Sequence, residues 1–189
     1  MANINENLLV RGARGNVGKQ FVFRKHGNNT NIGKMPVIRK DLAATEKQLE
    51  KRELFSSASL YAQGVISSAE LKKEYQKKAS PEKIAYNIAF RDYLKPPVVK
   101  KIDAENYHSA AGSIIVVHAK DDFRVAQVKV SIHTAAGILV EEGNAVLNPI
   151  NRDRWTYTAL QANSSLPGSV ISATALDIPG NTGKLDMVV

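Results

Sequence analysis

The acidic side chains are the first candidates for chemistry in this sequence. Asp121 and Asp122 stand together, and Asp103 and Asp177 are further acids in the same half of the chain. Clustered carboxylates of this kind can hold Ca²⁺, but the loop pattern D-x-[DN]-x-[DN]-G does not occur. The simpler interpretation is that they accept hydrogen bonds from backbone N–H groups in turns. The sequence favours this interpretation and leaves calcium open.

The other reactive side chains form no catalytic pattern. The chain contains no cysteine, which excludes disulfides and thiolate metal sites. The histidines lack the H-x-x-x-H spacing of a metal site, although His118 and His133 could be neighbours on adjacent strands. Neither a G-x-S-x-G elbow nor a phosphate loop ending in G-K-[ST] is present. We therefore expect no enzyme activity, no metal, no cofactor and no small-molecule substrate.

A basic and aromatic segment at residues 1–40 is a stronger candidate for function. It carries eight Lys and Arg residues against one acid. Phe21-Val-Phe23 alternates as a strand does, and residues 26–29 (HGNN) are typical of a turn. A return strand is expected at residues 30–34. The segment is therefore predicted to be an extended arm or a β-hairpin.

This arm has two interpretations. A lone two-stranded hairpin is marginally stable in water, so its apolar side chains need cover from this chain or another chain. In the first interpretation the arm docks on a sheet edge or groove of a neighbouring subunit, through Phe21, Val22, Phe23, Arg24, Lys25 and Ile32. In the second, the arm binds nucleic acid, with phosphate contacts from Arg11, Arg14, Lys19, Lys34, Arg39 and Lys40.

Residues 41–97 are predicted to form about three helices. Thr45-Glu-Lys-Gln48 fits a capping box, and the first helix should run to about Gly64. Ser67-Ser-Ala-Glu70 can open a second helix. Ser80-Pro81-Glu82 should begin a third, which Lys95-Pro96-Pro97 would end.

Residues 98–189 change to short alternating strands separated by turn signals. About seven strands at this spacing predict an immunoglobulin-like β-sandwich. The expected strands are Val98–Ile102, Ser113–Ala119, Val125–His133, Ile138–Val146, Trp155–Leu160, Ser169–Ala175 and Lys184–Val189.

Several motifs in this segment resemble those of bacterial immunoglobulin-like domains. Ala119-Lys-Asp-Asp122 resembles their strand–turn entry, and Ile138-Leu-Val-Glu-Glu-Gly143 resembles their middle hairpin. Ala175-Leu-Asp177-Ile-Pro-Gly180-Asn181 resembles the A-x-D-x-x-G-N turn that closes many of them. The residues expected to structure turns are Asp121, Asp122, Asp177, Gly180 and Asn181. The family has no common activity, and its members act as spacers, adhesive modules and structural units.

The N-terminal half resembles a group of uncharacterised proteins from Bacteroidota. The resemblance lies in Gly15-Asn-Val-Gly18 and in the later run Thr45-Glu-Lys-Gln48, Arg52 and Phe55. It implies a phage-like or other assembly role and gives no catalytic residue.

Together these patterns predict an α+β protein in three segments: an arm at 1–40, helices at 41–97 and a sandwich at 98–189. The charge is divided unevenly, at +11 for residues 1–102 and −3 for residues 103–189. Such a division fits subunits that attract one another, or an arm that meets nucleic acid. We expect a homo-oligomeric structural protein that assembles into a filament, ring or particle, with nucleic-acid binding as the alternative.

The sequence has no run long enough to span a membrane and begins with no signal-peptide core. We therefore expect synthesis in the cytoplasm, with the protein used in a phage-like particle or a filament released from the cell. Neither the symmetry of the oligomer nor its viral or cellular setting follows from the sequence.

Overall fold

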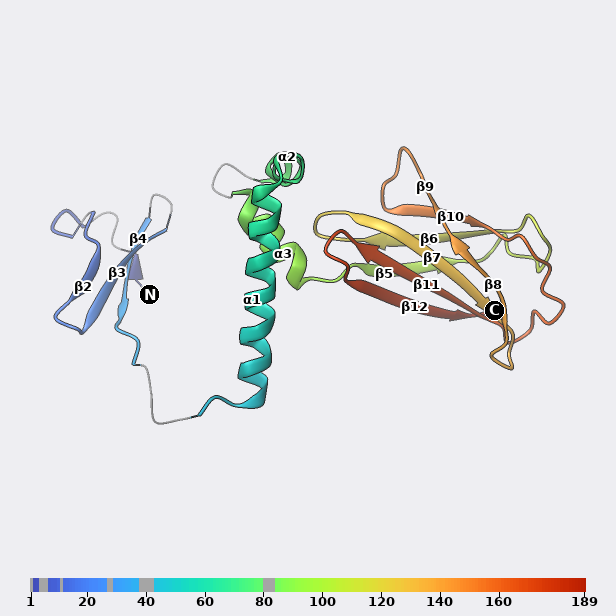
Figure 1. The fold of residues 1–189 in the computed structure, drawn as a ribbon, viewed down its shortest axis with the longest axis horizontal. Coiled ribbons are helices and arrows are strands. Elements are labelled where there is room, and N and C mark those ends of the chain that lie inside the picture. Colours follow the sequence, from blue (N-terminus) through green and yellow to red (C-terminus); the bar gives the residue numbers. More distant parts are fainter. Residues whose placement is uncertain (1, 4–6, 11, 27–28, 38–42, 80–83) are drawn as a thin grey trace. The chain divides into compact units, whose positions relative to one another are not determined.

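The computed structural model describes residues 2–3, 7–10, 12–26, 29–37, 43–79 and 84–189. Helices and antiparallel sheets both occur, which confirms the α+β prediction (Figure 1). The chain divides into two compact units, Met1–Glu50 and Lys51–Val189, which we call the N-terminal and C-terminal units. Across the described ranges, no helix combines the length and apolar character needed to cross a membrane.

The N-terminal unit contains a four-stranded antiparallel sheet with the order β1-β4-β3-β2. The predicted hairpin is confirmed as β3 (Phe21–His26) and β4 (Asn29–Lys34), and two short strands, β1 (Ala2–Asn3) and β2 (Gly15–Val17), were not predicted. β2 turns into β3 through Gly18 and Lys19, which have φ of 59° and 56°. Two successive residues with positive φ form a turn whose twist matches that of the flanking strands, and glycine adopts positive φ without strain, which suits Gly18 to this turn.

Three helices follow, and the first is longer than predicted. α1 spans Glu46–Ser67, and its start has the expected cap, since the Thr45 N–H donates to Gln48 Oε1 at 3.2 Å. The predicted end near Gly64 is wrong by three residues, because the next residue, Val65, is buried and keeps the last turn packed. α2 (Ala69–Lys78) then starts at Ser68, whose Oγ accepts the Leu71 N–H.

α3 spans Ala85–Leu94 and ends where Lys95-Pro96-Pro97 was predicted to end it. The predicted start at Ser80-Pro81-Glu82 lies outside the described residues. The helices pack around a small core that also contains Phe123 of the sandwich, whose ring stacks on Tyr75 at 3.9 Å between centroids. The helical layer and the sandwich are therefore joined by a shared core.

The sandwich consists of two antiparallel sheets. One has the order β5-β6-β10-β9, from Val98–Asp103, Ile114–Lys120, Arg154–Thr158 and Val146–Leu147. The other has the order β12-β11-β7-β8, from Thr182–Val188, Val170–Asp177, Val125–His133 and Leu139–Asn144. When the strands are lettered along the chain, the first sheet has the order A-B-E-D and the second begins G-F-C, as in an immunoglobulin-type sandwich, with β8 added beside β7.

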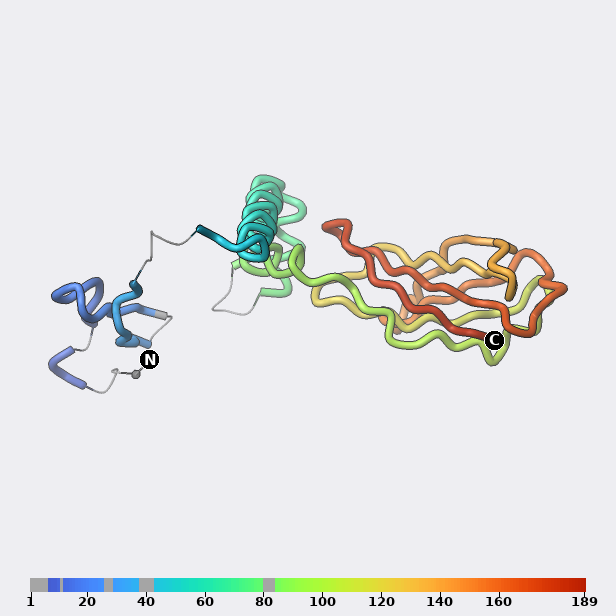
Figure 2. The backbone as a smooth tube through the Cα atoms, turned by 90° about the horizontal axis from the view of Figure 1, so that it is seen from below, coloured from blue at the N-terminus to red at the C-terminus, as the bar shows by residue number. Residues whose placement is uncertain are grey.

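The predicted strand Ile138–Val146 is divided between the two sheets. The chain leaves β8 and enters β9 at Ala145, which is buried and donates its N–H to Val128 O at 2.8 Å. At the other side of the sandwich, β12 runs beside β5 (Figure 2). Gly183 permits this approach, because a Cβ there would lie 1.9 Å from the Pro97 carbonyl oxygen.

Candidate interaction surfaces

Strand register gives the N-terminal sheet an apolar face. Phe21 is paired with Val17 on one side and Lys34 on the other, and Phe23 is paired with Ile32. Directly paired residues share a face of the sheet. Val17, Phe21, Phe23, Ile32 and Lys34 therefore form one face, which we call the arm face.

The described residues of this unit form no hydrophobic core. Phe21 is 47% exposed and Val17 is 54% exposed, while Val22, Phe23 and Ile32 are half-buried. Among the described residues of the N-terminal unit, no hydrophobic side chain is buried. A sheet of this composition would gain stability from a second layer packed on the arm face.

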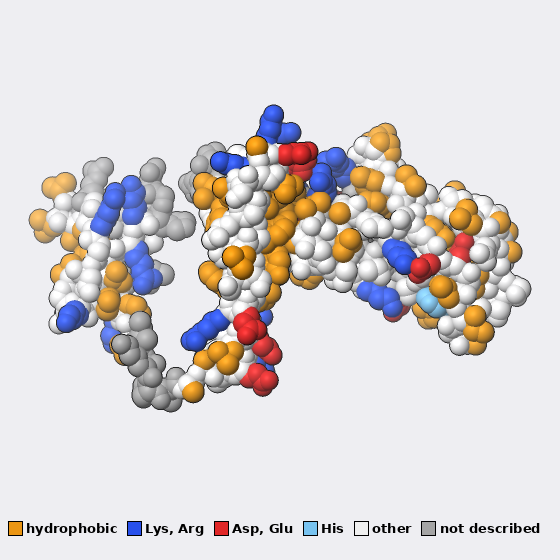
Figure 3. Space-filling model, in the orientation of Figure 1, with side chains coloured by type: hydrophobic (Ala, Val, Ile, Leu, Met, Phe, Trp, Pro, Cys, Tyr) orange, Lys and Arg blue, Asp and Glu red, His pale blue; other side chains and the backbone are white. Residues whose placement is uncertain are grey.

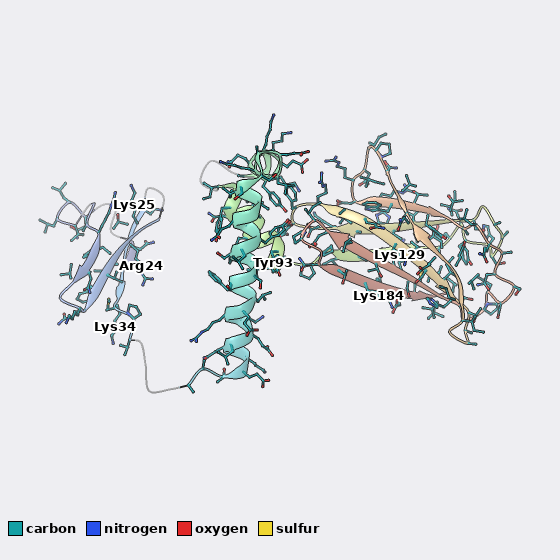
Figure 4. All side chains as sticks on the ribbon, in the orientation of Figure 1. Arg24, Lys25, Lys34, Tyr93, Lys129 and Lys184 are labelled. Atoms are coloured by element: carbon teal, nitrogen blue, oxygen red, sulfur yellow. The ribbon has the colours of Figure 1, made fainter. Side chains whose placement is uncertain are left out.

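The cations of the same unit are exposed. Arg24, Lys25 and Lys34 project from β3 and β4 (Figure 4), and Arg14 and Lys19 flank β2. Within the described part of the chain, none of these five forms an ion pair. Three further residues from the sequence prediction, Arg11, Arg39 and Lys40, lie outside the described residues.

Pairing within this sheet limits how it could bind a partner. β3 lies between β2 and β4, and at Phe21–Phe23 its backbone groups already face neighbouring strands on both sides. The two edges are β1 and β2, of two and three residues, and very short edge strands disfavour strand addition. Phe21 and Phe23 can therefore meet a partner through their side chains, as in docking on a groove, and not through their backbone.

A second exposed apolar surface lies at the end of the sandwich opposite the helices, which we call the distal end. β6 starts at this end and runs toward Asp121 and the helices, and strand pairing shows which other strands start or end beside it. The exposed large side chains of the distal end are Ile114, Ile138, Leu139, Leu160 and Val188, with exposures between 40% and 77%. Figure 3 shows orange side chains at this end of the sandwich.

The distal end has an acidic character. Its three loops, residues 104–113, 134–138 and 159–169, contain no Lys or Arg. Glu105 is exposed there, and the buried Glu141 accepts the N–H groups of Leu160 and Gln161 at 2.9 and 3.1 Å. Burial, with Glu141 nearby, raises the pKa of Tyr157 to about 12. Cations of a partner would be attracted to this end.

The turn residues of the sequence prediction lie at the helix end of the sandwich. Asp177 Oδ1 accepts the N–H groups of Gly180 and Asn181 at 2.8 and 2.6 Å, and Gly180 has a φ of 99°. Asn181 acts through its side-chain amide, which donates to Tyr93 O at 3.1 Å and to Asp177 Oδ2 at 2.8 Å. This turn ties α3 to the sandwich.

The pair Asp121-Asp122 is divided between two roles. Asp121 Oδ2 accepts the N–H groups of Phe123 and Arg124, both at 2.9 Å. Asp122 forms ion pairs with Arg91 of α3 at 2.7 Å and with Lys95 at 3.1 Å. Asp103 lies at the distal end instead, and among the described residues no group of three acids or histidines is placed to hold a metal ion.

The suggested histidine pair does not form. His118 lies in β6 and His133 in β7, which belong to different sheets.

A buried acid that sequence reasoning missed lies between the helices and the sandwich. Asp92 is 1% exposed, and its Oδ2 accepts the Tyr75 hydroxyl at 2.7 Å, which in turn meets the Tyr61 hydroxyl at 2.9 Å. The Asp121 carboxylate also lies close enough to act on the Asp92 carboxyl through its charge. Asp92 Oδ1 and Asp121 Oδ1 are both buried, and neither has a donor among the described residues.

Burial, helped by the nearby Asp121 charge and opposed by the Tyr75 hydrogen bond, raises the pKa of Asp92 to about 7. A signal existed in the sequence, since Asp92 follows Ala85 and Ala89 at helical spacing on the buried stripe of α3.

Comparisons with known proteins give the chain no family. No protein-family model and no curated protein matches it. Among solved structures, CopC from Methylosinus trichosporium OB3b is similar over 48% of this chain and 87% of its own, with 17% identity and a TM-score of 0.36. An engineered protein is similar over 46% of this chain and 18% of its own, with 18% identity and a TM-score of 0.29. The fold assignment therefore rests on the strand order described above.

Proposed function

We propose that this protein is a structural, self-associating protein in which the arm face of one copy docks on the distal end of the sandwich of another. The observation that carries the proposal is a sheet with an apolar face and no buried hydrophobic side chain among its described residues. On this proposal the protein is not an enzyme.

The arm face and the distal end both expose apolar side chains that would be buried if the two surfaces packed together. Burying a phenylalanine or leucine side chain contributes about 1.5–3 kcal/mol. Phe21 on the arm face and Leu160 and Ile138 at the distal end are each at least 47% exposed, so each has much to gain from a contact. Side-chain packing of this kind needs no free strand edge on the N-terminal sheet.

The charges support the same pairing. Lys34 lies on the arm face, Lys25 follows Phe23 on the same side of β3 and Arg24 lies on its other side, whereas the distal loops contain no cation. Opposite potentials of this kind accelerate encounter and reject wrong orientations, and they contribute less to the final affinity than the apolar contact does.

The contact joins two different surfaces, so it is heterologous. Repetition of a heterologous contact closes into a ring or extends as a filament. The finer interpretation is that the C-terminal unit is a bacterial immunoglobulin-like module used as a structural spacer, and that the chain belongs to the Bacteroidota assembly group. A phage-like particle or a released filament would be its setting.

Because the two surfaces differ, variants can block them separately. Phe21→Ser/Phe23→Ser disables the arm face, and Ile138→Ser/Leu160→Ser disables the distal end. Light scattering after size exclusion should show that the wild type forms oligomers, while each variant alone is a monomer of 20.6 kDa. An equimolar mixture of the two variants retains one intact contact and should give a heterodimer. Val146→Ser, at a residue 72% exposed in β9, is the matched control and should assemble as the wild type does.

Two outcomes would refute the proposal. A wild-type protein that stays monomeric at every concentration shows that the N-terminal sheet finds no second copy. A variant mixture that stays monomeric, with both variants folded by circular dichroism, shows that the two named surfaces are not each other's partners.

The alternative function is nucleic-acid binding through the same unit. It is favoured by the exposed cations Arg14, Lys19, Arg24, Lys25 and Lys34, which form no ion pair with any described residue. This alternative requires binding that weakens with salt and is lost when Arg24 and Lys25 are both changed to Gln.

A further inference from the structure

A cavity of about 520 Å³ opens where the end of α2 meets the sandwich. The end of β6, the β6–β7 turn and the β9–β10 loop complete its wall. Its charged lining consists of Lys77, Lys78, Lys120, Arg124 and Arg152, with Glu74, Asp121 and Asp153. A volume of this size is ordinary for a ligand site.

A second cavity of about 410 Å³ adjoins the first, because Lys120 and Asp121 line both. It adds Lys95 and Lys100 from the approach to β5 and from β5 itself, together with Asp122. We call the two cavities together the basic groove. Blue side chains gather over α2 and the adjoining end of the sandwich in Figure 3.

Most carboxylates of the groove are already engaged. Glu74 pairs with Arg124 at 3.3 Å, Asp122 pairs with Arg91 and Lys95, and Asp121 accepts backbone N–H groups. Lys77, Lys100, Lys120 and Arg152, in contrast, form no ion pair within the described ranges. The groove therefore presents an excess of cations to a ligand.

The last turn of α2 carries two lysines, and one of them is not a simple solvated cation. Lys77 and Lys78 would normally be solvated cations that complement the carboxyl end of the helix. Lys78 instead donates to the Phe123 carbonyl oxygen and lies 5.1 Å from the centre of the Phe123 ring. A favourable interaction with the helix dipole cannot account for the cations Lys120 and Arg152, because they lie on a strand and on a loop.

The cations are held on a fixed frame. Lys120 ends β6 opposite Val98 of β5. The loop that carries Arg152 is organised by Asn148 Oδ1, which accepts the N–H groups of Ile150 and Asn151, both at 2.9 Å. Asn151 Oδ1 then accepts the Asp153 N–H at 3.1 Å. Preorganised groups lose less entropy when a ligand binds.

We infer that the basic groove binds the phosphate backbone of a nucleic-acid strand. The succession of two adjoining cavities suits a linear polyanion, and a chain with net charge +8 and pI of about 9.6 attracts one. Phe123 is 7% exposed and stacked on Tyr75, so it offers no face to a base. Binding therefore follows charge and is independent of base sequence.

This inference is independent of self-association. The groove lies at the helix end of the sandwich, and the proposed docking surface lies at the distal end. It also places the nucleic-acid contacts on different residues from the N-terminal cations of the alternative function.

The test uses the full chain and a fluorescently labelled single-stranded DNA of about 20 nucleotides. Anisotropy titrations in about 0.05 and 0.2 M salt give the affinity and its salt dependence. The variant Lys77→Gln/Lys120→Gln/Arg152→Gln should bind at least about tenfold more weakly at the lower salt. Its log–log salt slope should be shallower by about 2, since each phosphate contact to a single strand contributes about 0.7.

The matched control is Lys101→Gln/Lys129→Gln/Lys184→Gln, which removes the same charge from surface ion pairs of the sandwich. It should bind as the wild type does to within about threefold. If circular dichroism shows that the groove variant is unfolded, Arg152→Glu in the exposed loop replaces it, with an expected loss of at least about threefold.

Four results would overturn the inference. The wild type could fail to bind in the lower salt, or the control variant could lose as much affinity as the groove variant. Loss confined to Arg24→Gln/Lys25→Gln would place the site on the N-terminal unit. Sodium triphosphate that displaces the strand at equal phosphate concentration would assign the groove to a compact anion.

Discussion

The two units of this chain contain similar sheets with different interiors. Both are antiparallel and carry aromatic and β-branched residues. In the sandwich, inward side chains such as Ile115, Val130 and Ile171 are completely buried. No hydrophobic side chain is buried among the described residues of the N-terminal sheet. Strand pairing makes a sheet, but a second layer is needed to make a core.

The comparison extends to the charges. Some exposed lysines of the sandwich pair with acids: Lys129 with Glu142 at 2.8 Å and Lys184 with Asp186 at 3.0 Å. Both lysines are labelled in Figure 4. Arg24 and Lys25 have no such partner among the described residues. The C-terminal unit encloses its own core, whereas the N-terminal sheet has apolar side chains that only a further layer would bury.

The largest expected effect comes from equivalent truncations in the two sheets. Ile171→Ala removes a fully buried side chain and should lower the free energy of unfolding of the C-terminal unit by about 2–5 kcal/mol. Ile32→Ala, at a half-buried site, should change it by less than about 0.5 kcal/mol and weaken self-association instead. Urea unfolding followed by Trp155 fluorescence measures the first, because this buried residue is the chain's sole tryptophan.

If Ile32→Ala lowered the stability of the sandwich as much as Ile171→Ala does, the contrast between the two units would be wrong, because the N-terminal sheet would then share the core of the C-terminal unit. Light scattering on the same samples reports the assembly.

The strands of the sandwich could be predicted because each one has its own pattern in the local sequence. Alternation in Val128-Lys-Val130-Ser-Ile132 marks a strand with one buried face, and turns separate each strand from the next. β1 and β2 have two and three residues, too few for any period to appear. The division of residues 138–146 between two sheets also leaves no sequence signal, because Ala145 fits either strand.

The missed site depends on distant contacts. Asp92 is an acid on the buried stripe of a helix, which sequence reasoning could have noticed. Its partners Tyr75 and Asp121 come from α2 and from the β6–β7 turn, and no spacing along the chain relates the three. The basic groove was hidden for the same reason, since Lys77, Lys120 and Arg152 meet only in the folded unit.

The next effect is a pH dependence that should belong to the C-terminal unit. The pKa of Asp92 is raised to about 7 in the folded protein from an ordinary value of 3.8. Between these values the folded state holds a proton that the unfolded state has lost, so this group stabilises folding at low pH and ceases to do so as pH rises through about 7. The slope is at most about 1.4 kcal/mol per pH unit.

Asp92→Asn should abolish this slope, because the amide does not titrate in this range of pH. Urea titrations at several values between pH 4 and 8 should show the variant gaining stability relative to the wild type as pH rises. Asp186→Asn is the control: a Ser172 hydrogen bond, with Lys184, lowers the Asp186 pKa, so its contribution is already constant above about pH 4. A flat difference for Asp92→Asn would mean that Asp92 is ionised throughout.

The smallest effect concerns the surface charges. Lys129→Gln/Lys184→Gln removes two exposed ion pairs and should lower the free energy of unfolding by less than about 1 kcal/mol, because such pairs are screened by water and salt. The same charge change in Arg24→Gln/Lys25→Gln should leave unfolding unaltered and slow the association of subunits in low salt, measured by stopped-flow light scattering. The difference between the two variants should vanish near 1 M salt, where the Debye length is about 3 Å. If Lys129→Gln/Lys184→Gln slowed association as much as Arg24→Gln/Lys25→Gln, the net charge of the chain would govern encounter, and Arg24 and Lys25 of β3 would have no special part in it.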